Sequence, residues 1–186
     1  MIKWLIAFSC NNKIPSKKED FLRVKSLILA WISTTLIMWF YVIFSYSIFD
    51  FPTVGNFGLI YTIIHTLTPV LYRYTKSIIL AGVNISISAL FFQVTFCIFN
   101  GGLDSPSAIW FTAHPVIMSF FGSKKLIIFS IITNIFVILG LFFMGEAGYF
   151  PLDALGQSAT RVMRISSLVF LDIIIATYTI VFIQST

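Results

Sequence analysis

Charged residues are scarce in this sequence, and their scarcity decides the class of protein. They make up 10% of the 186 residues, whereas hydrophobic residues make up 58%. A soluble domain carries roughly 25% charged residues. So few polar side chains cannot cover the surface of a water-soluble globule. The composition therefore predicts an integral membrane protein.

Cysteine and histidine are also scarce, with two of each. Cys10 lies in a lysine-rich N-terminal segment and Cys97 lies inside an apolar run, so the pair does not predict a disulfide. Two thiols are too few for a metal framework, and the two histidines lack the close spacing of metal ligands. We therefore expect neither a metal site nor a cofactor.

Sequence motifs of catalysis are missing as well. There is no phosphate-binding loop, no glycine-rich nucleotide loop and no soluble catalytic module after the last apolar run. The connections between apolar runs contain no histidine, cysteine or grouped carboxylates. We therefore expect no enzymatic activity of this chain. Its net charge of +5 follows from membrane topology, so no nucleic-acid partner is expected either.

The apolar runs that are present have the length of membrane-crossing helices. A helix needs ~20 apolar residues to cross the bilayer, and a barrel strand alternates in polarity instead. The sequence therefore predicts an all-α integral membrane bundle of six transmembrane helices, at 26–49, 55–72, 77–99, 106–121, 126–144 and 163–183. Residues 1–25 form a cytoplasmic or interfacial segment that starts with a short helix, and residues 26–186 form the six-helix domain.

The distribution of basic residues predicts the orientation. Ten of the twelve lysines and arginines precede the first span or lie in the second-to-third and fourth-to-fifth connections. Under the positive-inside rule, that side faces the cytoplasm. Both termini are then cytoplasmic, and the chain is a multi-pass protein with the lipid bilayer as its first partner.

Three ionisable side chains lie near the middle of predicted spans: His65, His114 and Asp172. Such groups are functional candidates by default, and a carboxylate at the bilayer centre costs at least ~2.5 kcal/mol. Asp172 should therefore face the bundle interior, with one of the two histidines as its expected partner. Two interpretations stay open: a ligand-binding or proton-sensing role, and a hydrogen bond that only fixes helix packing.

Each histidine has a proline nearby. Pro69 cannot donate a hydrogen bond to the carbonyl of His65, and Pro115 leaves the carbonyl of Phe111 free in the same way. Both helices are expected to kink there and to expose a backbone acceptor inside the bundle.

The connection before the fourth span contains strong turn residues. Gly101 and Gly102 are able to end the third span through positive φ values. Asp104 or Ser105 is expected to cap the fourth span, with Pro106 at its first helical position.

Within the fourth span, Trp110, His114 and Met118 follow at intervals of four and share one helix face. Sixteen residues, 106–121, make a short span of roughly 24 Å, so the preceding turn is expected to dip below the outer membrane surface.

Small motifs between residues 100 and 151 resemble a recurring bacterial module. GG-x-x-SP is followed by a tryptophan, a proline, G-x-K-K, an apolar span and G-E-A-G-x-x-P. The matching residues are Gly101, Gly102, Ser105, Pro106, Trp110, Pro115, Gly122, Lys124, Glu146, Gly148 and Pro151. Their order is similar to the six-helix membrane input domain of bacterial sensor and hybrid histidine kinases, and to the membrane anchors of some class III adenylyl cyclases.

The resemblance implies that the chain receives a signal. A small, lipophilic molecule such as a quorum-sensing signal would bind within the bundle. The resemblance also implies a location in the inner membrane of a bacterium. The sixth helix would pass the signal to a cytoplasmic kinase or cyclase module. The chain would form a homodimer through this helix and its cytoplasmic continuation.

Two functions remain open on the sequence. In a sensor, the ligand-binding candidates are His65, Trp110, His114 and Asp172 in the pocket, and Asp104, Ser105 and Glu146 at its rim. The pocket is expected between the second, fourth and sixth spans. In a small proton-coupled transporter, the same histidines and Asp172 would carry protons past a broken fourth helix.

Overall fold

The computed structural model describes residues 2–10, 17–48, 51–121, 123–150 and 156–183. Within these ranges every regular element is a helix, which confirms the all-α prediction. Four helical stretches of the described chain are long and apolar enough to cross a membrane: Glu19–Ser47, Pro52–Thr75, Ile78–Phe99 and Lys124–Glu146. These stretches are compatible with a membrane protein.

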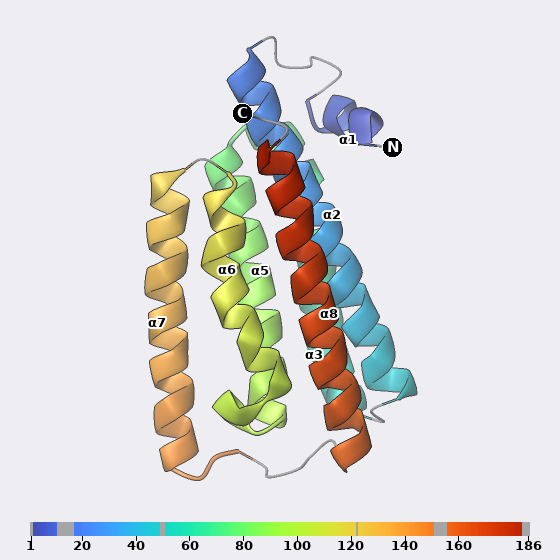
Figure 1. Cartoon of the computed structure of the whole chain (residues 1–186), viewed down its shortest axis with the longest axis vertical. Helices are drawn as coiled ribbons and strands as arrows, with labels where there is room; N and C mark the ends of the chain where they lie inside the picture. Colours follow the sequence, from blue (N-terminus) through green and yellow to red (C-terminus); the bar gives the residue numbers. More distant parts are fainter. Residues whose placement is uncertain (1, 11–16, 49–50, 122, 151–155, 184–186) are drawn as a thin grey trace.

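The long helices run side by side along one axis (Figure 1). In chain order the elements are α1 (Ile2–Ser9), α2 (Lys18–Ser47), α3 (Pro52–Thr66), α4 (Thr68–Thr75), α5 (Ile78–Phe99), the 3₁₀ turns η1 (Gly102–Asp104) and η2 (Pro106–Ile109), α6 (Trp110–Ser119), α7 (Lys124–Glu146) and α8 (Gly156–Ile183). Helix α5 is central, because it contacts α2, α3, α4, α6 and α7. Helix α1 and the last turns of α8 lie at the same end of the molecule (Figure 1).

The short N-terminal helix predicted for the first residues is present as α1, and it is tied to the bundle. The guanidinium of Arg73 lies 4.5 Å from the centre of the Phe8 ring, a cation–π distance. The ammonium of Lys76 donates to the carbonyl of Ser9 at 3.2 Å. These contacts hold α1 against the end of α4.

The structure departs from the predicted spans at three places. The second span, predicted as one helix with a kink at its proline, breaks at Leu67: α3 ends at Thr66 and α4 begins at Thr68, one residue before Pro69. The predicted fourth span opens with the 3₁₀ turn η2, so α6 is a ten-residue α-helix that starts only at Trp110. The predicted domain boundary after residue 25 falls inside α2, which starts at Lys18.

The predicted turn chemistry between α5 and α6 is confirmed. Gly101 and Gly102 have φ values of +88° and +66°, and Ser105 accepts a hydrogen bond from the backbone N–H of Ser107 at the start of η2. At Gly102 a side-chain β-carbon would collide with the ring of Phe150. The resemblance residues Gly122 and Pro151 lie outside the described residues.

Gly101→Ala and Gly102→Ala form a matched pair of substitutions. Both place alanine at positive φ, which costs about 1–3 kcal/mol. Only Gly102→Ala also overpacks the Phe150 ring, for about 1–3 kcal/mol more, since a β-carbon at Gly101 meets no described atom within 4 Å. We expect Gly102→Ala to lower the unfolding free energy in detergent micelles by the larger amount. Equal losses would contradict the close packing of Phe150 on this turn.

Candidate functional site

His65 joins three helices from a fully buried position, with 0% of its side chain exposed. Its Nε2 lies 2.7 Å from the hydroxyl of Thr34 on α2, and its Nδ1 lies 2.8 Å from the hydroxyl of Ser88 on α5. Both hydroxyls also reach a backbone carbonyl of their own helix, Ser88 that of Asn84 at 2.6 Å and Thr34 that of Ala30 at 2.7 Å. The single ring N–H of a neutral His65 therefore serves one of the two hydroxyls, and the other hydroxyl donates to the ring.

His114 is bound in the same manner between α5 and α7. Its Nε2 lies 2.7 Å from the hydroxyl of Ser86, and its Nδ1 lies 3.0 Å from Oδ1 of Asn134. The amide nitrogen of Asn134 donates to the carbonyl of Phe111 at 2.7 Å, which fixes the amide orientation. Nδ1 of His114 therefore carries the proton, and the Ser86 hydroxyl donates to Nε2 of a neutral ring.

The two histidines contact α5 on opposite faces of that helix. Ser86 and Ser88 are two residues apart, which separates them by about 200° around a helix. One therefore faces α6 and the other faces α3. Two separate sets of hydrogen bonds, one around each histidine, are therefore joined through the backbone of α5 and together link α2, α3, α5, α6 and α7. We name these residues the histidine network: Thr34, His65, Ser88, Ser86, His114 and Asn134.

Both backbone acceptors predicted from the prolines are present and occupied. The carbonyl of His65 accepts from the indole N–H of Trp31 at 3.2 Å and from the hydroxyl of Thr68 at 2.6 Å. The carbonyl of Phe111 accepts from Asn134. The prolines thus supply acceptors for bonds from α2 and α7, and these bonds satisfy polar groups that lipid cannot solvate.

The predicted pairing of Asp172 with a histidine is wrong. The side chain of Asp172 on α8 is exposed, and both ring nitrogens of each histidine already have other partners. The hydroxyls of α5 and α2 outcompete the carboxylate, because they reach the rings from adjacent helices without bringing a charge into the core.

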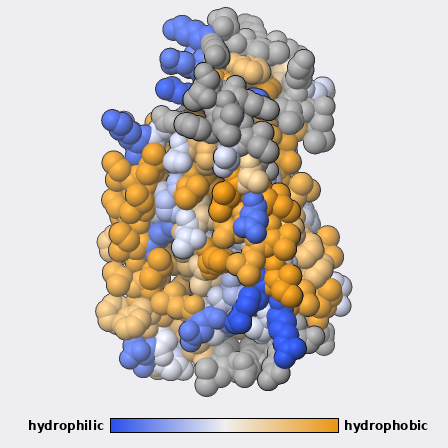
Figure 2. All heavy atoms as spheres, viewed as in Figure 1, coloured by the Kyte–Doolittle hydropathy of each residue, from blue (hydrophilic) through white to orange (hydrophobic). Residues whose placement is uncertain are grey.

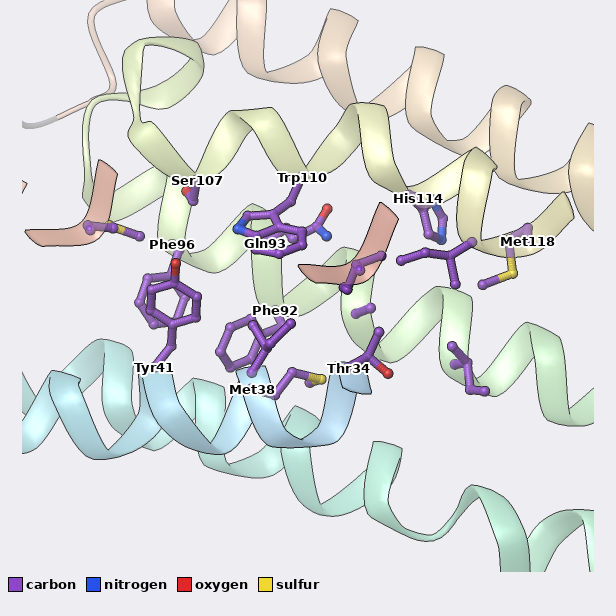
Figure 3. Close-up of a pocket in the computed structure, with 16 residues that line it drawn as sticks. Thr34, Met38, Tyr41, Phe92, Gln93, Phe96, Ser107, Trp110, His114 and Met118 are labelled. Carbon is purple, nitrogen blue, oxygen red and sulfur yellow. The ribbon is translucent and has the colours of Figure 1, made fainter. Parts of the chain in front are cut away.

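The predicted face of α6 looks into an internal cavity of about 50 Å³. Trp110, His114 and Met118 all line it, as their spacing indicated. The opposite walls come from α2, α5 and α8, and Figure 3 shows Trp110 pointing toward Tyr41 and Met38 of α2. The predicted location was partly wrong, since α3 contributes no lining residue and His65 lies outside the cavity.

Two buried polar atoms at this cavity have no hydrogen-bond partner in the described part of the chain: Nε1 of Trp110 and Oε1 of Gln93. The indole N–H lies toward the Tyr41 hydroxyl without reaching hydrogen-bond geometry. Buried polar groups are nearly always paired, and leaving one unpaired costs about 1–3 kcal/mol. An unpaired donor and an unpaired acceptor thus belong to two side chains that line this cavity.

The Tyr41 hydroxyl connects the cavity wall to α8. It lies 2.8 Å from the hydroxyl of Ser167 and 3.1 Å from that of Ser166. Asn100 adds a contact at 3.0 Å from its amide nitrogen to the sulfur of Met163. Met163 and Ile174 of α8 line the cavity directly. These contacts make α8 one wall of the cavity without including it in the histidine network.

None of the three predicted rim residues lines the cavity itself. Ser105 is buried, and its hydroxyl lies 2.7 Å from that of Ser107, a cavity residue. Asp104 is exposed and lines a separate groove between the 3₁₀ turns and α8, together with Arg164. Glu146 is exposed at the end of α7 and lines neither space. Among the described residues, no group of three or more histidine, cysteine, aspartate or glutamate side chains is placed to hold a metal ion.

No protein-family model, curated protein or solved structure matches this chain. The resemblance to kinase input domains therefore stays a prediction.

Several important residues carried little signal in the sequence. Thr34, Ser86 and Ser88 are ordinary hydroxyl residues inside apolar runs, yet each holds a histidine. The alternation Asn84, Ser86, Ser88 places polar groups on two faces of α5, and that pattern indicates a helix with polar neighbours on both sides.

Ser86→Ala and Ser45→Ala separate the network from ordinary buried serines. Both serines are 0% exposed, but the Ser45 hydroxyl donates only to the carbonyl of Tyr41 in its own helix. Ser86→Ala leaves Nε2 of His114 without a donor, so we expect a loss of about 1–2 kcal/mol of unfolding free energy in micelles. Ser45→Ala should change the stability by less than half of that. A similar small effect for both would mean that the His114 bond contributes nothing.

Proposed function

We propose that this chain is a membrane-embedded sensor domain of six spans with both termini in the cytoplasm of a bacterial cell. It receives a small molecule that carries a polar group. It relays the event through α8 to a cytoplasmic output module. The observation that carries the proposal is the cavity with the unpaired Trp110 and Gln93 atoms, one wall of which is α8.

The cavity has the chemistry of a specific site for a small polar group. An indole N–H donates and an amide oxygen accepts, so a hydroxyl or a comparable group satisfies both at once. The rest of the lining is mainly aromatic and aliphatic, including Met38, Phe92 and Ile117. A few polar groups on an apolar wall are the usual composition of ligand sites.

The arrangement of hydrogen bonds supports a relay through α8. The histidine network ties α2, α3, α5, α6 and α7 together, which makes them one rigid unit. Helix α8 is attached through the Tyr41 hydroxyl, Met163 and the cavity lining. A molecule in the cavity touches both parts, so its binding energy acts on their relative position. Helix α8 ends at the same end of the molecule as α1 (Figure 1), and in this proposal the output module follows there.

A proton-coupled transporter is the weaker proposal. It requires histidines that exchange protons with a pathway, but the ring nitrogens of His65 and His114 are all engaged with side chains of neighbouring helices. Asp172 lies away from them on the exposed face of α8.

Ala89→Leu tests the relay without a ligand, because Ala89 lines the cavity and leucine would occupy part of it. We expect the distance between spin labels at Ile60→Cys on α3 and Ile173→Cys on α8 to shift by about 1–2 Å. The labelled protein carries Cys10→Ala and Cys97→Ala and is measured in nanodiscs. Ala89→Ser, which adds little volume, should leave the distance unchanged. Unchanged distances in both variants would contradict the relay.

Gln93→Leu tests whether the unpaired amide is a binding group or a structural one. It removes a buried acceptor that has no partner, so we expect the unfolding free energy in micelles to rise by about 1 kcal/mol. An increase in stability on substitution is expected for a residue that serves binding at the expense of stability. Ser88→Ala, which removes a paired group, should lower the stability instead. If Gln93→Leu lowers the unfolding free energy as much as Ser88→Ala does, the Gln93 amide has a structural partner. The proposed binding site would then have no free acceptor.

A further inference from the structure

The groove beside Asp104 lies between the 3₁₀ turns and α8, at the end of the molecule opposite α1 (Figure 1). It has a volume of about 360 Å³, and its exposed walls include Asp104 and Arg164. Figure 2 shows hydrophilic residues gathered at this end of the visible face, whereas hydrophobic residues cover most of its middle. The groove is therefore a space at a polar end of the bundle, apart from the internal cavity.

Two serines form the floor of the groove, and their hydroxyls contact residues of the internal cavity. Ser105 and Ser167 line the groove but are only 4% and 1% exposed. The Ser105 hydroxyl lies 2.7 Å from that of Ser107, and the Ser167 hydroxyl lies 2.8 Å from that of Tyr41. Ser107 and Tyr41 both line the cavity. At two places, therefore, one pair of hydrogen-bonded hydroxyls spans the wall between the groove and the cavity.

The 3₁₀ turns that form one side of this wall are weakly held. Elements η1 and η2 have three and four residues, and 3₁₀ turns have poorer hydrogen-bond geometry than an α-helix. The backbone N–H groups of Asp104 and Ser105 reach the carbonyls of Gly101 and Gly102 at 3.3 Å and 3.2 Å, longer than the usual distance of about 2.9–3.0 Å. Gly101 has a φ of +88°, and a β-carbon there would meet no described atom within 4 Å. A shift of these turns away from α8 thus breaks few strong bonds and leaves the long helices in place.

The charges around the groove and the cavity favour an uncharged molecule. Asp104 and Arg164 line the same groove with opposite charges, so an ion of either sign is attracted by one and repelled by the other. The described residues that line the cavity include no lysine, arginine, aspartate or glutamate. An ion that entered would lose its hydration without gaining a counter-charge, which is strongly unfavourable. The N–H of Trp110 and the oxygen of Gln93 match instead a neutral group that both accepts and donates.

We propose that the groove is the entrance to the cavity, and that it admits a small uncharged molecule that carries a hydroxyl or an amide group. The turns η1 and η2 move away from α8 as the molecule passes. The hydroxyls of Ser105 and Ser167 then exchange their present partners for its polar group. The class of ligand rests on the proposed cavity site, whereas the route depends only on the wall between the groove and the cavity.

Thiol modification of the full chain in nanodiscs tests whether the cavity is reached from outside. In a background of Cys10→Ala and Cys97→Ala, Met38→Cys places one thiol on the cavity wall. Ile28→Cys is the matched control, because Ile28 lies on the same helix, is 0% exposed against 3% for Met38, and does not line the cavity. With the uncharged reagent hydroxyethyl methanethiosulfonate, we expect Met38→Cys to react roughly tenfold faster, since local opening is more frequent than global unfolding. Equal rates would overturn the entrance.

A bulky side chain in the groove tests the route. Leu168 and Val169 are neighbours on α8 and are 47% and 49% exposed, but only Leu168 lines the groove. We expect Leu168→Trp to slow the modification of Met38→Cys about tenfold, because it closes the local opening, and Val169→Trp to change it less than about twofold. Since both positions are exposed, neither substitution disturbs the core. If the two variants behave alike, the reagent enters elsewhere and the groove is not the entrance.

The class of molecule is tested with reagents of similar size and different charge. Each rate at Met38→Cys is divided by the rate of the same reagent at Tyr74→Cys, a position that is 81% exposed. We expect the sulfonatoethyl and trimethylammonium-ethyl reagents to be roughly a hundredfold slower than the hydroxyethyl reagent by this ratio. Equal ratios would contradict an entrance for uncharged molecules. These rates need no movement of α8, so a failure of the Ala89→Leu distance test would leave them unchanged, and the two proposals fail separately.

Discussion

Buried polar groups need hydrogen bonds from within the protein, and this constraint organises the bundle. His65 and His114 each use both ring nitrogens, and each bond ends on a different helix. The proline-freed carbonyls of His65 and Phe111 are satisfied from α2 and α7 in the same network. The central position of α5 follows, because it supplies Ser86 and Ser88 to both histidines.

The same constraint explains what the network leaves out. Helix α8 is held by hydroxyl contacts at Tyr41, by a thioether contact at Met163 and by the Phe170 ring against Phe40 and Tyr41. In the described chain, an indole N–H and an amide oxygen near this helix are unpaired. Unpaired polar groups beside this helix lower the stability of the fold, and a purely structural role does not explain them. In a sensor they are the place where a ligand replaces missing hydrogen bonds and moves one helix against five.

Local features were predictable from the sequence, and partnerships between distant residues were not. Helical periodicity placed Trp110, His114 and Met118 on one face, and proline chemistry located the free carbonyls, because both depend on neighbours in the chain. The partner of Asp172 was predicted wrongly, because rarity of charge suggested pairing among the three ionisable groups. Instead, hydroxyl residues, which are common in membrane helices, form hydrogen bonds with the histidine rings.

The fixed tautomer of His114 gives its hydrogen bonds a single direction. Ser86 donates to Nε2, Nδ1–H donates to Asn134, and the amide of Asn134 donates to the carbonyl of Phe111. The chain of donors thus ends on a peptide oxygen that has no proton to pass on. Proton hopping needs every link to turn around in concert, and here the last link has no way to turn. This path through the described residues therefore does not conduct protons.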